Sequence, residues 1–225
     1  MDNRQRNKFH KYIDAPKTEI YTVNVPGRHG LLDFSEALTG SPVYKNRTVS
    51  ITLAYPGSGS QWHDRYSEIL DQLHGRVVQM VMDSDPRYYY EGRCSVSSKR
   101  KDGFYSTFTI SLDAYPYKFE TADSLGDWLW DLLHFENGII REYGHLTIPA
   151  GGILPVRVIG SPMVTQPRIT VNAACTVEIQ GIRYDLRKGV NPNVFTLGNE
   201  EILLQFSNAT DSDIALSIDF RGGRL

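Results

Sequence analysis

Residues Val49–Tyr55 (VSITLAY) decide the fold class, because apolar side chains occupy every odd position and small residues lie between them. Successive side chains of a β-strand point to opposite faces, so this alternation predicts a strand with one face on a core. Phe104–Leu112 repeats the pattern. With Arg93–Ser97 before it and an Asp-Gly turn at Asp102-Gly103 between them, it predicts a β-hairpin with a charged tip.

One helix is predicted in the first half of the chain, over residues 61–74. Ser60 can cap it and Gly75 can end it, since a helix often stops at a residue with positive φ. The strand Val77–Met82 follows directly, and its apolar run predicts burial on both faces. These elements predict an α+β unit with an antiparallel sheet. The apolar side chains of the helix recur at helical spacing: Trp62, Tyr66, Ile69, Leu70 and Leu73.

The second half predicts short strands separated by Gly, Pro, Asn and Ser turns, which is typical of a β-sandwich. Before them, Leu125–Leu133 could form a short helix with almost no polar face, which must be buried. We therefore expect a mainly β chain with a first domain over residues 1–120. Residues 121–225 would hold a linker and the sandwich. The expected strands are His145–Ile148, Pro155–Gly160, Arg168–Val171, Cys175–Ile179, Ile182–Leu186, Ile202–Phe206 and Ala215–Phe220.

The composition of the chain limits which partners it can bind and in which cellular compartment it is made. The 225 residues carry a formal charge of -2, from 24 basic and 26 acidic side chains. This balance predicts no nucleic-acid binding, which needs a basic excess. Cys94 and Cys175 lie far apart in sequence, so we expect two free thiols in a protein made in a reducing cytosol. Met1–Lys11 lacks the apolar core of a signal peptide, and no window reaches the roughly 20 apolar residues of a membrane span.

Motifs for catalysis or for a cofactor are weak. The six histidines form no zinc-protease pair, and neither cysteine has a CxxC neighbour. Pro56–Ser60 precedes a helix but lacks the lysine of a phosphate loop. Asp83 and Asp85 could serve as the acid–base pair of a hydrolase, or could form a turn whose aspartates bond nearby backbone amides. We expect no cofactor, no metal and no enzymatic activity.

The tyrosine run Tyr88-Tyr89-Tyr90 has two readings. In an extended strand Tyr88 and Tyr90 share one face and Tyr89 takes the other. Such side chains can pack in a core or a subunit interface, because tyrosine buries a large area with a polar tip. They could also stack on a ligand.

Five segments follow one another in the first half: Val25–Asp33, Tyr44–Arg47, Leu73–Arg76, Tyr89–Arg93 and Ala114–Lys118. In this order they resemble the distal tail (Dit) proteins of long non-contractile phage tails. The resemblance covers about residues 20–120, and the second half agrees with it through Trp130-Asp131, Phe135–Gly138 and Ile218–Leu225. His29 departs from the family pattern, which often has Asp there.

The resemblance implies a fold and an assembly. The second half would be a galectin-like β-sandwich, and the N-terminal domain would be the belt of a hexameric ring at the end of a tail tube. The ring would join the tail tube protein to tail-tip or receptor-binding proteins of the baseplate, for host attachment. The protein would be a virion component of a phage or prophage, made in the bacterial host cytoplasm.

A closed ring needs two different faces of each subunit to meet. The hairpin around Lys99–Gly103 is the candidate for reaching a neighbouring subunit, and the alternative, a solvated charged turn, accounts for its sequence at least as well. An alternative function is a carbohydrate-binding module in the C-terminal sandwich, with Tyr143, Tyr184 or Phe195 as stacking platforms. The ring-interface candidates are Lys99, Arg100, Lys101, Asp102, Tyr88 and Tyr90.

Overall fold

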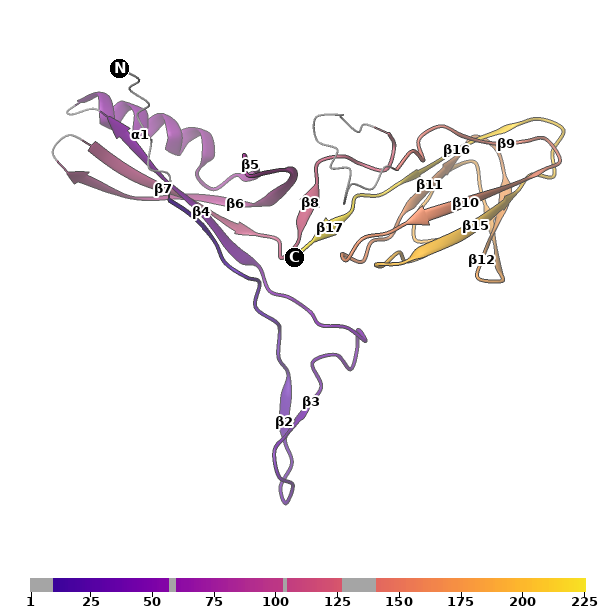
Figure 1. Cartoon of the computed structure of the whole chain (residues 1–225), viewed down its shortest axis with the longest axis horizontal. Helices are drawn as coiled ribbons and strands as arrows, with labels where there is room; N and C mark the ends of the chain where they lie inside the picture. Colours follow the sequence, from indigo (N-terminus) through magenta and orange to yellow (C-terminus); the bar gives the residue numbers. More distant parts are fainter. Residues whose placement is uncertain (1–9, 57–59, 103–104, 127–140) are drawn as a thin grey trace. The chain divides into compact units, whose positions relative to one another are not determined.

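The computed structural model describes residues 10–56, 60–102, 105–126 and 141–225 (Figure 1). The chain is mainly β, with one α-helix among these residues, which confirms the expected fold class. It divides into two compact units. Unit 1 runs to Met80 and also takes Tyr90–Pro116, and unit 2 consists of Val81–Tyr89 and Tyr117–Leu225. The sequence-based division at residue 120 treats the domains as consecutive, whereas unit 2 also draws on Val81–Tyr89.

Unit 1 is built on antiparallel strands in the order β1 (His10–Ile13), β4 (Arg47–Pro56), β7 (Tyr105–Ala114) and β6 (Asp85–Asp102). Strand β4 has one face on a core, as its alternating sequence predicts. Val49 is fully buried and lies opposite the buried Leu112 of β7. Strands β6 and β7 form the expected hairpin, with a register shift between Ser97 and Arg100.

The expected helix is present as α1 (Ser60–Leu73). The helix ends at Leu73, two residues before Gly75, whose φ of 78° is the left-handed conformation that glycine adopts readily. Hydrogen bonds then fix the end of the helix to β6. The Val96 backbone N–H donates to His74 Nδ1 at 3.1 Å, and the Gly75 N–H donates to the Cys94 carbonyl at 2.8 Å.

The expected burial of Val77–Met82 on both faces is wrong. The segment forms the strand β5 (Val77–Met82), but its residues alternate between more and less exposed. Val77 is 59% exposed and Val81 is 50% exposed. Gln79 lies between them on the same face of the strand, so the apolar run is interrupted on the side that faces solvent.

A long two-stranded ribbon connects β1 to β4, and the sequence did not predict it. Its outer part is the hairpin of β2 (Thr22–Asn24) and β3 (Leu31–Asp33), which is visible in Figure 1 as a projection. Gly27 and Gly30 take positive φ values, 82° and 77°, in the turn. We call residues 15–46 the arm.

Unit 2 contains two four-stranded antiparallel sheets, in the orders β10-β15-β12-β13 and β14-β11-β16-β9. All seven strands expected in this region are present. A small third group consists of β8 (Lys118–Glu120), which pairs with β17 (Gly223–Arg224) and with the start of β6. The sandwich strands are β9 (Leu146–Ile148), β10 (Ile153–Ile159), β11 (Arg168–Val171), β12 (Cys175–Ile179), β13 (Ile182–Leu186), β14 (Gly189–Asn191), β15 (Glu201–Ser207) and β16 (Ile214–Asp219).

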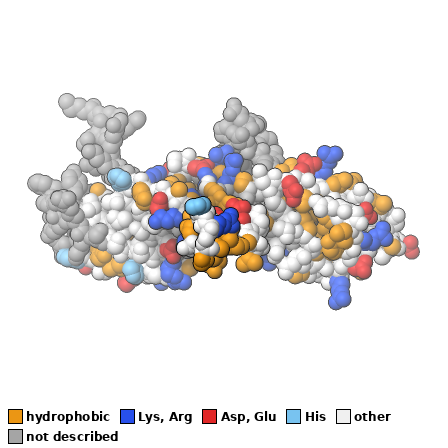
Figure 2. All heavy atoms as spheres, turned by 90° about the horizontal axis from the view of Figure 1, so that it is seen from below, with side chains coloured by type: hydrophobic (Ala, Val, Ile, Leu, Met, Phe, Trp, Pro, Cys, Tyr) orange, Lys and Arg blue, Asp and Glu red, His pale blue; other side chains and the backbone are white. Residues whose placement is uncertain are grey.

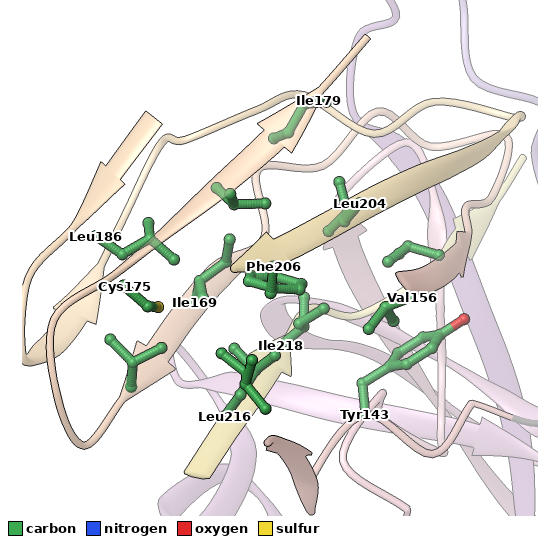
Figure 3. Close-up of a cluster of buried hydrophobic side chains, with 14 of the residues drawn as sticks. Tyr143, Val156, Ile169, Cys175, Ile179, Leu186, Leu204, Phe206, Leu216 and Ile218 are labelled. Atoms are coloured by element: carbon green, nitrogen blue, oxygen red, sulfur yellow. The ribbon is translucent and has the colours of Figure 1, made fainter. Parts of the chain in front are cut away.

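The core of unit 2 lies between these two sheets (Figure 3). In β15, every second residue is buried, and Phe206 is fully enclosed. Ile169 of β11 and Ile218 of β16 meet it from the other sheet, and both are also 0% exposed. Period-2 alternation on facing sheets thus encloses a single apolar layer, as expected of a β-sandwich.

Some expectations concern residues outside the described ranges. These are most of the possible helix Leu125–Leu133, the segments Trp130-Asp131 and Phe135–Gly138, the glycine loop at 57–59, and the hairpin tip at 103–104.

Candidate assembly surfaces

The arm is a ribbon held by backbone hydrogen bonds and by few side-chain contacts. The Glu19 N–H donates to the Val43 carbonyl at 2.7 Å, and the Phe34 N–H donates to the Tyr21 carbonyl at 2.8 Å. Every residue from 11 to 46 is exposed or half-buried. The arm therefore has no core of its own, and an isolated two-stranded ribbon is at best marginally stable in water.

The arm nevertheless carries many large apolar side chains. Ile20 is 70% exposed and Leu38 is 100% exposed. Figure 2 views the molecule from below, with the turn of the arm toward the viewer, and hydrophobic side chains gather there. Contiguous exposed apolar surface of this kind marks interaction sites. The exposed large apolar side chains of the arm are Ile20, Tyr21, Val23, Leu31, Phe34, Leu38 and Val43.

The hairpin tip expected to reach a neighbouring subunit is only partly described. The backbone of Lys99, Arg100, Lys101 and Asp102 belongs to β6, and Asp102 pairs with Tyr105 of β7. The side chains of these four residues lie outside the described part of the structure. Their role in a ring contact stays a prediction.

Tyr88 and Tyr90, the other interface candidates, are both buried, with 8% and 7% of their surface exposed. Lys118 Nζ lies 4.4 Å from the centre of the Tyr88 ring. The Arg47 guanidinium lies 4.8 Å from the centre of the Tyr90 ring. Each ring is thus covered by a cation of the same chain. A contact of either tyrosine with another subunit stays a prediction, and little of either ring is accessible for it.

Asp83 and Asp85 lie in different surroundings. Asp83 is exposed in the turn between β5 and β6, as the turn interpretation predicted. Asp85 accepts a hydrogen bond from Lys118 Nζ at 2.7 Å and lies 3.2 Å from Arg87 Nη2. Burial raises the pKa of the Asp85 carboxyl, but Lys118 and then Arg87 outweigh it, so the net shift of this pKa is downward. A carboxylate held in this way is an ion-pair partner.

The proposed sugar-stacking platforms belong to the sandwich interior. Tyr143 as an exposed platform is wrong: it is 8% exposed, and its hydroxyl donates to the Arg157 carbonyl and accepts from the Ile159 N–H. Tyr184 and Phe195 are half-buried and pack against the same core. The sheet that contains β12 and β15 has a shallow pocket of about 260 Å³, and no aromatic side chain lines it. The lining residues are Glu178, Gln180, Gly181, Glu201, Ile202, Leu203 and Gln205.

Cys94 and Cys175 are both free and buried, and burial raises the pKa of each thiol. No group of three or more His, Cys, Asp or Glu side chains in the described ranges is arranged to hold a metal ion. Among the same residues, no helix has the length and apolar character that crossing a membrane requires.

Comparison with known proteins gives a structural likeness only. No protein-family model and no curated protein matches the chain. The crystal structure of the SPP1 Dit protein, described as a paradigm of the hub adsorption apparatus of phages that infect Gram-positive bacteria, matches 98% of this chain and 91% of its own, with a TM-score of 0.57 and 14% identity. A designed double-stranded β-helix matches 33% of this chain and 92% of its own, with a TM-score of 0.27 and 19% identity, too low to inform the fold. The chain therefore has a Dit-like fold.

Proposed function

We propose that this chain is a structural hub of a bacteriophage tail tip. Six copies would form a closed ring that joins the end of the tail tube to tail-tip or receptor-binding proteins. The protein would act in the virion and would have no enzymatic activity. The number of copies and the identity of the partners rest on the resemblance to Dit proteins, and the SPP1 Dit likeness supports the fold they would need.

The exposed arm carries this proposal. A ribbon of 32 residues with seven exposed large apolar side chains and no buried residue has no stabilising core within its own chain. Another copy of the chain would supply that core, because a closed ring places each subunit's arm against a different face of the next subunit. A stable contact of this type buries upwards of about 1,000 Å² in total.

The exposed charges of the arm fit a contact that is specific as well as apolar. Lys17, Glu19, Arg28, Glu36 and Lys45 lie among the apolar side chains and are all exposed. Charged groups at the rim of an interface suppress wrong partners and set the register of the contact. A purely apolar arm would instead favour indiscriminate association.

Sedimentation velocity and negative-stain microscopy of the purified full chain test the proposal. We expect a concentration-dependent species with a mass near six subunits, and images of rings with a central hole. A double variant of the arm, Ile20→Ser with Leu38→Ser, should remain monomeric. A wild-type chain that stays monomeric at concentrations of 100 μM and above (roughly the affinity limit of weak assemblies) would refute the ring.

A further inference from the structure

We draw no further inference here: the strongest candidate, the Ser- and Thr-rich face of the unit 1 sheet around Ser50, Thr109 and Ser111, is a surface patch on neighbouring strands, and nothing in the structure shows what covers it.

Discussion

Substitutions in the arm test the proposed assembly most directly. The apolar side chains of the arm are exposed in the single chain, so removing them should weaken the association of subunits and leave the stability of the single chain unchanged. Ile20 is 70% exposed and Leu38 is 100% exposed. Full burial of such a side chain stabilises by about 1.5–3 kcal/mol. Scaled by these fractions, Ile20→Ser with Leu38→Ser should cost about 2.5–5 kcal/mol per contact, which weakens the subunit dissociation constant roughly 70- to 5,000-fold.

Sedimentation equilibrium over a range of concentrations measures this dissociation constant directly. A control with Ile153→Ser and Val190→Ser removes two equally apolar side chains, 62% and 61% exposed, from the sandwich. The control should assemble like the wild type. Circular dichroism should give similar melting temperatures for the two unassembled variants, because exposed substitutions change stability by about 0.5 kcal/mol or less. Rings of unchanged affinity in the arm variant would refute the reasoning, as would equal weakening in the sandwich control.

Three further predictions concern stability and are checked by thermal or chemical denaturation. Gly160→Ala should lower the melting temperature by about 4–10 °C, because its Cβ would lie 1.8 Å from the Gly198 carbonyl oxygen; Gly198→Ala, with nothing within 4 Å, should not. Phe206→Ala should cost about 3–5 kcal/mol, while Leu203→Ala on the exposed face of the same strand should cost far less; equal costs would contradict the assigned faces. Because the pKa of Asp85 is lower in the folded chain, its ion pair with Lys118 contributes stability above the unfolded pKa of about 3.9 and loses it as pH falls through the folded value. Asp85→Asn should therefore reduce stability at pH 7 and flatten its fall below pH 4.

The sandwich could be predicted from sequence almost entirely, whereas the arm could not, and the difference is physical. Each sandwich strand has one buried face, so apolar residues recur at every second position of its sequence, as they do in β15. The β2–β3 ribbon buries neither face, so its sequence has no such alternation. The very short β8, β14 and β17 were missed because two or three residues cannot establish a period.

The sequence itself indicates that Arg47 lies on the buried face of β4. Arg47 continues the odd-numbered face of β4, two residues before Val49, so the alternation itself placed a cation on the buried side. Tyr90 is one of the predicted interface residues, but sequence alone does not show that its ring lies 4.8 Å from the Arg47 guanidinium. Such contacts depend on which distant segments of the chain pair with each other, and a single sequence does not show that pairing.

An arm without a buried residue also bears on the fate of copies that find no partner. Proteases cleave extended, poorly packed segments that fit their active sites, and residues 15–46 are such a segment until something covers them. Copies that stay unassembled would be trimmed at this ribbon, while copies whose arm is covered by another molecule would resist digestion. The same surface that promotes assembly would thus limit how long an orphan molecule persists.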